Sequence, residues 1–359
     1  MRSVRAAMQL VDLTSCATFR TTYRKIQAKQ VGNNFRAVTE IVTAKYDDLV
    51  AQMKPNGIIV KNHYVAINAS DVNFTNGKYM RVQPPFDVGF ESLGEIVQVG
   101  SKISKSKIGT YVAVMQYGVF SEYTLTTDSV AIPVPDLRPE YLGLISSGLT
   151  ASIALSEQGR MTKGETVLVT AAAGGAGQIA VQLAKQAGNH VIGTCSSDEK
   201  AAMLKSMGCD RVINYKTEDF GKVLKKEYPR GVDIVFESVG GEFFNICLRN
   251  LAPKGRLLVI GTVASYSTEK GIQGDKVDTL QLLASSRTVA GFFMPAYNHL
   301  FKEHMQSMIG ALLSGKLKVE IDTAGLAGLG NVVDGVEYLH KGKNKGKLVI
   351  PLLKSASKL

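Results

Sequence analysis

The segment 166–182, which reads TVLVTAAAGGAGQIAVQ, constrains the fold of this chain more than any other stretch. An apolar run at 167–169 is followed by small residues and glycines, and then by apolar residues at helical spacing. Such a run is typical of a buried parallel strand, and the change of spacing indicates a helix directly after it. The segment therefore predicts a strand that turns sharply into a helix.

The turn between them, residues 172–177, matches the glycine fingerprint of dinucleotide sites, with Ala172 in the first glycine position. Gly174 would let the backbone approach a pyrophosphate, and Gly177 would let the helix pack closely on the strand. The first helical turn offers unpaired N–H groups and a partial positive charge to that anion. Because strand, turn and helix come in the required order, the sequence predicts a dinucleotide site.

The chain of 359 residues has about twice the length of a typical domain, so we expect two domains. No apolar run is long enough to span a membrane, which predicts a soluble protein. The net charge of +11 raises the question whether the protein binds nucleic acid. The basic residues are spread along the chain without interleaved aromatic residues, so we expect no nucleic-acid partner. The cysteines form no CxxC pair and are interpreted as reduced thiols of an intracellular protein. They are Cys16, Cys195, Cys209 and Cys247.

The two ends of the chain carry targeting signals. Residues 1–30 are rich in Arg and Lys and contain one acid, Asp12, which suits a mitochondrial transit peptide or a plain extension ahead of the first strand. The tail at 355–359 closes on Ser357-Lys358-Leu359, the peroxisomal signal that an import receptor binds. Because this tripeptide is more specific than an Arg-rich start, we predict the peroxisome, with the mitochondrion as the alternative.

The stretch 35–135 is rich in short apolar runs separated by glycines, which indicates a small, strongly curved, barrel-like β domain. A helical stretch at 139–159 then leads to the glycine turn. From there strands and helices alternate, which predicts a doubly wound α/β sheet with its ligand at the carboxyl ends of the strands. An amphipathic helix at 297–314 and a strand at 348–350 that rejoins the first domain complete the chain. The further strands predicted in the sheet are 190–195, 211–213, 232–237, 256–261 and 288–291, and the helices are 200–207, 217–228, 242–250 and 278–285.

The end of the second strand favours NADPH over NADH. A site for NAD places Asp or Glu there to bind the ribose hydroxyls, whereas residues 194–197 are small and neutral. Lys200 follows within one helical turn and Tyr215 follows the third strand, and a cation with hydroxyl donors suits a 2′-phosphate. Asp198 and Glu199 are acidic, but we interpret them as first-turn residues, with Ser196 as N-cap and Glu199 completing a capping box.

Several segments carry a family resemblance in addition to the glycine turn. They are NASDVNFTNGKY (68–79), PPFDVGFESLGE (84–95), VLVTAAAGGAGQ (167–178), GTCSSDEK (193–200), ESVGG (237–241), GFF (291–293) and GKNKGK (342–347). With them the chain resembles the medium-chain dehydrogenase/reductase superfamily, and within it the quinone-reductase and prostaglandin-reductase branch. The resemblance covers residues 35–351.

This resemblance implies an α/β fold that combines a doubly wound, Rossmann-type nucleotide domain with a β-rich, GroES-like catalytic domain. The implied boundaries are an extension at 1–30, the catalytic domain at 31–148 and 298–354, the nucleotide domain at 149–297 and the tail at 355–359. A homodimer is also expected, because similar reductases pair through the sheet edge of the nucleotide domain.

The resemblance further implies a set of NADPH-binding residues. They are Gly174, Gly175, Ala176 and Gly177 in the glycine turn; Ser196, Lys200 and Tyr215 at the adenosine phosphate; Ser238, Ile260 and Tyr266 in the cleft; Phe292, Phe293 and Met294 at the nicotinamide; and Asn344 across the cofactor. Ile260 and Phe292 could equally be core residues.

A catalytic metal is not expected. Zinc alcohol dehydrogenases use a Cys and a Gly-His-Glu segment, and the corresponding residues here are Gly89-Phe90-Glu91 with no Cys before them. The four-cysteine structural lobe is absent as well. Without these ligands there is no Lewis acid to polarise an alcohol oxygen, so we predict a metal-free site.

A metal-free site with NADPH can reduce a carbon–carbon double bond conjugated to a carbonyl group. Tyr79 is the candidate catalytic residue, because similar enone and enoyl-thioester reductases have a tyrosine at this place and a phenol can donate to an enolate oxygen. Tyr79 could also merely pack near the cleft, and a ribose hydroxyl or water could donate instead. Asn68 and Asp71 are interpreted as turn formers.

With the resemblance, the leading hypothesis is an NADPH-dependent 15-oxoprostaglandin 13-reductase that also accepts other lipid enals and enones. The enzymatic alternatives are a 2-enoyl thioester reductase and a quinone oxidoreductase. An NADPH-binding structural or sensing protein with little turnover is the non-enzymatic alternative.

Overall fold

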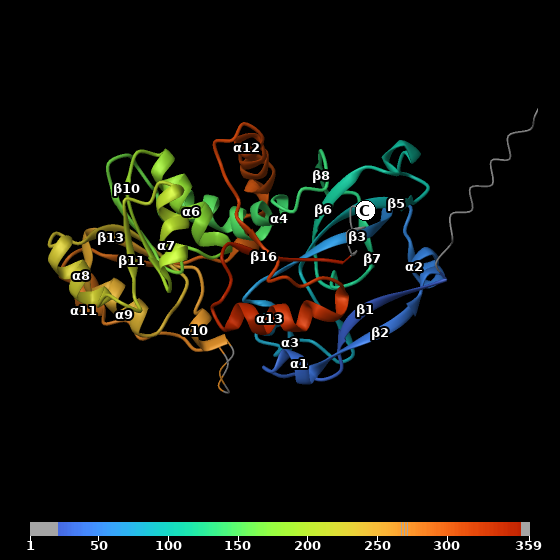
Figure 1. Ribbon diagram of the computed structural model, residues 1–359, viewed down its shortest axis with the longest axis horizontal. Coiled ribbons are helices and arrows are strands. Elements are labelled where there is room, and N and C mark those ends of the chain that lie inside the picture. Colours follow the sequence, from blue (N-terminus) through green and yellow to red (C-terminus); the bar gives the residue numbers. More distant parts are fainter. Residues whose placement is uncertain (1–20, 267, 269, 271, 353–359) are drawn as a thin grey trace, which may run out of the picture.

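The computed structural model describes residues 21–266, 268, 270 and 272–352, which form an elongated molecule with two halves side by side (Figure 1). One half is built on a six-stranded parallel sheet and the other on a curled seven-stranded sheet with a smaller three-stranded one beside it. The two-domain α/β fold predicted from the sequence is therefore confirmed.

The parallel sheet has the strand order β11-β10-β9-β12-β13-β14. The chain thus starts in the middle, runs outward to one edge, returns and runs to the other edge, which is the doubly wound topology. Its strands are β9 (Thr166–Val169), β10 (His190–Cys195), β11 (Arg211–Asn214), β12 (Val232–Glu237), β13 (Leu251–Val259) and β14 (Thr288–Gly291).

Helices cover both faces of this sheet because its strands are apolar on both sides. Val167 and Val169 pack with α6 on one face, and Leu168 packs with α8 and α9 on the other. The helices of this half are α6 (Gly175–Gln186), α7 (Asp198–Ser206), α8 (Phe220–Glu227), α9 (Glu242–Arg249), α10 (Val263–Tyr266) and α11 (Thr279–Leu283).

The seven-stranded sheet is organised around β3 (Gly57–Ile67), which pairs with β5, β7 and β16. Register shifts between β3 and β5 mark bulges that bend the sheet, as expected for a strongly curved domain. The other elements of this half are β1 (Thr22–Ala28), β2 (Thr39–Lys45), β4 (Phe86–Asp87), β5 (Glu91–Val99), β6 (Tyr111–Met115), β7 (Tyr123–Thr127), β8 (Ile132–Val134), β15 (Ile321–Asp322), β16 (Lys347–Pro351), α1 (Phe35–Val38), α2 (Tyr46–Gln52), α3 (Asp71–Thr75), η1 (Lys105–Lys107), η5 (Leu329–Asn331) and α13 (Val332–His340).

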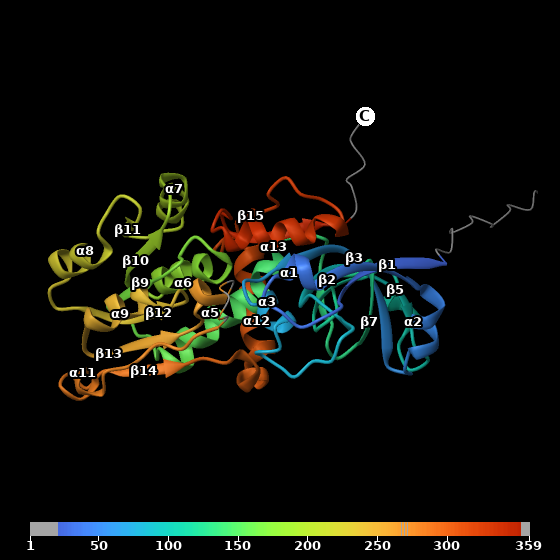
Figure 2. The same cartoon turned by 90° about the horizontal axis from the view of Figure 1, so that it is seen from below.

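Helical segments connect the two halves near the middle of the molecule (Figure 2). They are α4 (Tyr141–Gly143), η2 (Leu144–Gly148), α5 (Leu149–Ile153), η3 (Ala154–Gln158), η4 (Met294–Leu300) and α12 (Phe301–Leu313). The predicted domain boundaries at 148–149 and 297–298 fall inside these connecting helices and stay predictions. The predicted helix 297–314 is divided in the structure: residues 297–300 belong to the 3₁₀ segment η4, which is kinked at Tyr297, and α12 begins only at Phe301.

The predicted N-terminal extension is too long at its carboxyl end. Residues 22–28, assigned to it from their basic composition, form β1, in which Tyr23, Ile26 and Ala28 are buried while Arg24 and Lys25 are not. Residues 1–20, with Cys16, and the tail at 355–359 lie outside the described residues, so the targeting predictions stay predictions. Among the described helices, none is long and apolar enough to cross a membrane.

Candidate active site

A cavity of about 1020 Å³ lies at the carboxyl ends of the parallel strands and is lined by residues of both halves. All fifteen predicted site residues line it: Tyr79, Gly174, Gly175, Ala176, Gly177, Ser196, Lys200, Tyr215, Ser238, Ile260, Tyr266, Phe292, Phe293, Met294 and Asn344. The fold thus brings together segments that lie up to 265 positions apart (Tyr79 to Asn344, 344 − 79). Their individual roles stay predictions.

The glycine turn forms the middle of the cavity wall. Gly174 is the N-cap residue of α6, and among the described residues no side chain caps this helix end. At Gly177 a Cβ atom would lie 2.5 Å from the carbonyl oxygen of Ala171, so any larger residue would push the helix away from the strand. The turn therefore presents a helix N-terminus to the cavity, where an anion is stabilised.

The three residues predicted to bind the adenosine phosphate gather at one end of the cavity, here called its adenosine end after that prediction. The Lys200 ammonium donates hydrogen bonds to the Gly342 carbonyl at 2.6 Å and to Ser196 Oγ at 3.4 Å. Burial lowers the pKa of Lys200. Tyr215 packs edge-on against Phe243, with ring centroids 5.1 Å apart. A cation and two hydroxyl groups thus line one end of the cavity, as a 2′-phosphate requires.

The predicted capping box at Ser196 is wrong by one residue. Helix α7 begins at Asp198, and its N-cap is Ser197, whose Oγ accepts from the Lys200 backbone N–H. Glu199 does not reach back to the cap, because its carboxylate pairs with Lys345 instead. Ser196 therefore precedes the cap and lines the cavity.

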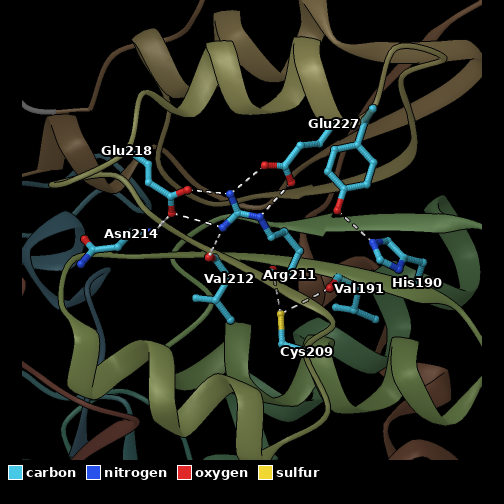
Figure 3. A network of polar contacts seen from close by, with 9 residues as sticks. His190, Val191, Cys209, Arg211, Val212, Asn214, Glu218 and Glu227 are labelled. Carbon is cyan, nitrogen blue, oxygen red and sulfur yellow. Dashed lines mark hydrogen bonds and ion pairs between the residues drawn. The ribbon is translucent and has the colours of Figure 1, made fainter.

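Behind the adenosine end lies a charged network that sequence analysis missed (Figure 3). The Arg211 guanidinium bridges Glu218 at 2.5 Å and Glu227 at 2.8 Å, and its hydrogen bonds lower the pKa of both carboxyl groups. Glu218 also accepts from the Asn214 backbone N–H, while the Asn214 side chain donates to Asp198. The network therefore fixes the turn that carries Tyr215 against the start of α7.

Two tyrosines from different halves meet inside the cavity. The hydroxyl oxygens of Tyr79 and Tyr266 lie 3.3 Å apart, and the Tyr266 oxygen also accepts from the Thr262 backbone N–H. Tyr266 is buried, and burial raises its pKa, whereas Tyr79 is 39% exposed. The Tyr79 hydroxyl is thus held at the cavity surface, where it can donate to a bound substrate.

At the far end, the predicted nicotinamide segment follows β14. Phe292 stacks on Tyr297 with ring centroids 5.1 Å apart, and the Thr150 hydroxyl contacts the Met294 sulfur at 3.8 Å. Phe293 is 65% exposed. The Asn344 side chain donates to the Gly346 carbonyl. Gly346 forms a β-bridge with Gly174, so Asn344 lies on a segment that runs beside the glycine turn.

A buried ion pair at the cavity wall was also missed. Lys347 Nζ lies 2.5 Å from Glu91 Oε2 and 2.7 Å from Asn68 Oδ1, and the Asn68 amide donates to the same Glu91 oxygen. Asn68 therefore does more than form a turn. Asp71 does form one, since its carboxylate accepts from the Asn68 backbone N–H. Lys347 and Glu91 each lie in a segment that carries the family resemblance, but the residues around them in the sequence do not indicate that the two form an ion pair.

The residues at this cleft differ from those of a zinc site. Phe90 stands where the resemblance to zinc alcohol dehydrogenases would place a zinc-ligating histidine, and the neighbouring Glu91 is engaged by Lys347. In the described part of the chain, no three His, Cys, Asp or Glu side chains gather so that they could hold a metal ion.

A dinucleotide fits this set of residues. One continuous cavity runs from a cationic end at Lys200, past the N-terminus of α6, to a phenol hydroxyl at Tyr79. A cation suits a phosphate, a helix N-terminus suits a pyrophosphate, and a phenol beyond them can donate to a substrate placed beside the nicotinamide. Fold and site together define a two-domain, dinucleotide-binding protein with its cleft between the domains.

Comparisons with known proteins agree with this class. The Alcohol dehydrogenase GroES-like domain family matches residues 54–163 and the Zinc-binding dehydrogenase family matches residues 175–312. The chain is 48% identical over 339 residues to prostaglandin reductase-3 of Bos taurus, covering 92% of this chain and 89% of the relative. It is 44% identical over 340 residues to a probable quinone oxidoreductase of Leishmania amazonensis, covering 92% and 98%.

Among solved structures, Escherichia coli quinone oxidoreductase complexed with NADPH superposes with a TM-score of 0.79 at 26% identity, covering 91% of this chain and 99% of that one. The chain belongs to the medium-chain dehydrogenase/reductase superfamily. The resemblance inferred from the sequence is therefore confirmed.

Proposed function

We propose that this chain is an NADPH-dependent reductase of carbon–carbon double bonds conjugated to a carbonyl group, with 15-oxoprostaglandins among its substrates. The observation that carries the proposal is one cavity that joins the Lys200 ammonium, the glycine turn and the Tyr79 hydroxyl. The bovine relative is named a prostaglandin reductase and the bacterial structure was solved with NADPH, which supports both parts of the proposal.

The residues of the cavity divide the binding of NADPH among them. Lys200, Ser196 and Tyr215 bind the 2′-phosphate, and the N-terminus of α6 binds the pyrophosphate. Residues 292–294 and Asn344 hold the nicotinamide end.

When bound, NADPH supplies a hydride to the β-carbon of the enone. The electron pair of the double bond then moves toward the carbonyl carbon, negative charge collects on the oxygen, and a proton completes the α-carbon. Tyr79 stabilises that oxygen by donating a hydrogen bond, and Tyr266 holds the Tyr79 hydroxyl in place. A donor that binds the oxygen more strongly in the transition state than in the bound substrate accelerates the reaction. A donor that binds both states equally well does not accelerate the chemical step.

The substrate side of the cavity suits a lipid. Phe74 packs against Tyr79, Phe90 and Tyr117 with ring centroids 5.4, 5.6 and 4.6 Å apart, and all four side chains line the cavity. An aromatic wall next to the reacting tyrosine can bury a hydrocarbon chain. A quinone remains a second candidate substrate, favoured by the name of the Leishmania relative.

The proposal is tested by NADPH consumption with a 15-oxoprostaglandin, crotonyl-CoA, a quinone and a conjugated aldehyde. We expect turnover of the prostaglandin, with deuterium from labelled NADPH found on the β-carbon of a saturated product by mass spectrometry. Turnover of crotonyl-CoA alone would favour the thioester reductase. Tight NADPH binding without a saturated product from any activated olefin would contradict the proposal and favour a sensing role.

We also propose a homodimer that forms through β14, the last strand at one edge of the parallel sheet. Helix α11 leads into β14, and its Leu280 and Leu283 are 70% and 78% exposed. Among the described strands, β14 pairs with β13 alone, and a strand edge of this kind beside exposed leucines favours pairing with a second copy. Light scattering should give twice the chain mass for the wild type and a lower mass for Leu283→Asp; a monomeric wild type would contradict the dimer.

A further inference from the structure

Residues 341–346, here called the strap, join α13 to β16 and reach across to the nucleotide half. The Gly342 carbonyl accepts from the Lys200 ammonium at 2.6 Å, and the Gly346 N–H donates to the Ala173 carbonyl at 2.8 Å. The Lys345 ammonium lies 2.8 Å from Glu199 Oε1. The strap therefore touches the glycine turn and the first turn of α7.

Glu199 creates an electrostatic problem at this end of the cavity. It is the neighbour of Lys200 in the chain, and its side chain is 76% exposed. A carboxylate near the end of the second strand is the feature that selects the ribose hydroxyls of NADH. The same negative charge would repel a 2′-phosphate, which carries nearly two charges of its own.

Lys345 is held where it can cancel that charge. Its backbone N–H donates to Asp322 at 2.9 Å, and its ammonium also lies 3.5 Å from Glu320. Lys345 is not among the described residues that line the cavity, whereas its neighbours Asn344 and Gly346 are. The side chain thus reaches Glu199 without facing the bound nucleotide.

We propose that Lys345 determines the preference for the 2′-phosphate by neutralising the Glu199 carboxylate, as a positioning residue that does not touch the cofactor. The inference rests on the proposed use of NADPH and extends it to a residue outside the cavity. Under this proposal, a residue of the strap influences which nucleotide binds to a site on the other half of the molecule.

The test measures binding of 2′,5′-ADP and 5′-AMP to the full chain by calorimetry, with no substrate present. We expect Lys345→Met to weaken 2′,5′-ADP on the order of five- to tenfold at low salt and to leave 5′-AMP unchanged. Because the Glu199 side chain is largely exposed, the loss should shrink at about 0.5 M salt.

The double variant Glu199→Gln/Lys345→Met separates the two ways in which Lys345 could act. If Lys345 works through Glu199, removing both charges restores 2′,5′-ADP binding to within about twofold of wild type. If Lys345 binds the phosphate itself, the loss persists and the proposal is overturned. Lys341→Met is the matched control, because Lys341 lies on the same strap but pairs with Glu337 on α13. Thermal unfolding verifies that each variant is folded.

The same data distinguish this inference from the proposed cofactor. A wild type that binds both nucleotides equally contradicts the use of NADPH, and the inference falls with it. A wild type that prefers 2′,5′-ADP, together with a Lys345→Met variant that prefers it as strongly, overturns the role of Lys345 alone.

Discussion

The Nζ atom of Lys347 lies 2.5 Å from Oε2 of Glu91, and both side chains are buried although 256 residues separate them. Lys347 starts β16 and Glu91 starts β5, so the pair links the two edges of β3. A Cβ atom at Gly175 would lie 3.1 Å from the Lys347 side chain, which places the pair directly beneath the glycine turn. The pair therefore lies within the catalytic half, at the point where the Lys347 side chain comes close to the glycine turn of the nucleotide half.

Breaking this pair should cost stability. Lys347→Met leaves the Glu91 carboxylate buried without a cation, and we expect the free energy of unfolding to fall by about 3–5 kcal/mol. The double variant Glu91→Gln/Lys347→Met should lose less, because no buried charge is left over. Urea unfolding followed by circular dichroism measures both. A double variant less stable than Lys347→Met would show that packing matters more than the charge.

Removing the cation at the adenosine end should change cofactor preference. Lys200→Ala should weaken NADPH by about tenfold or more and NADH much less, because only NADPH offers a phosphate to the ammonium. Fluorescence titration with both nucleotides gives the two dissociation constants. Lys205→Ala, in the last turn of the same helix, is the control. Equal losses for the two nucleotides would contradict the assignment.

Removing the hydroxyl of the candidate catalytic tyrosine should slow the reaction and leave cofactor binding intact. Tyr79→Phe deletes the donor to the enolate oxygen, so we expect kcat to fall by about 100-fold with little change in the dissociation constant of NADPH. Tyr228→Phe, whose hydroxyl contacts His190 away from the cavity, should retain activity. Unchanged kcat in Tyr79→Phe would assign the proton to another donor.

Asp71 should make stability depend on pH. Burial raises the pKa of this carboxyl group from 3.8 to about 7, and the described residues provide no hydrogen-bond partner for its Oδ1. The folded state therefore holds a proton that the unfolded state has lost between these values, and folding is progressively disfavoured as the pH rises through that window. Asp71→Asn removes the ionisable group, and with it this contribution to the pH dependence of stability.

The measurement compares Asp71→Asn with wild type by urea unfolding from about pH 4 to pH 8. The free energy of unfolding of the variant relative to wild type should rise with pH and level off above the folded pKa of about 7. Glu237, whose pKa burial also raises to about 7, is present in both proteins and cancels in the difference. A constant difference would contradict the shift at Asp71.

The glycine turn could be predicted in full because its determinants are local. An apolar strand, small residues and a helical pattern follow one another within 166–182, and each acts over a few residues. The alternation of strands and helices predicted the doubly wound sheet in the same way. The N-cap of α7 was placed one residue early, because adjacent serines offer two equivalent caps and only the backbone distinguishes them.

Other features depended on segments that meet only in the folded chain. The basic residues of 22–28 suggested an extension, yet Ile26 and Ala28 of the same segment pack in a core that also contains Ile350 and Leu352. Asn68 was interpreted only as a turn former. Its partners Glu91 and Lys347 lie far along the chain, so their hydrogen bonds with Asn68 could not be predicted from neighbouring residues.

The sequence by itself determined the alternating strands and helices of the nucleotide half, the dinucleotide turn and the neutral end of the second strand, since these follow from residue type and short-range spacing. The tertiary structure alone decided which charges neutralise one another: Lys347 with Glu91, Lys345 with Glu199, and Arg211 with Glu218. The physical reason is that electrostatic pairing depends on distance in space, which is fixed only when remote segments pack together.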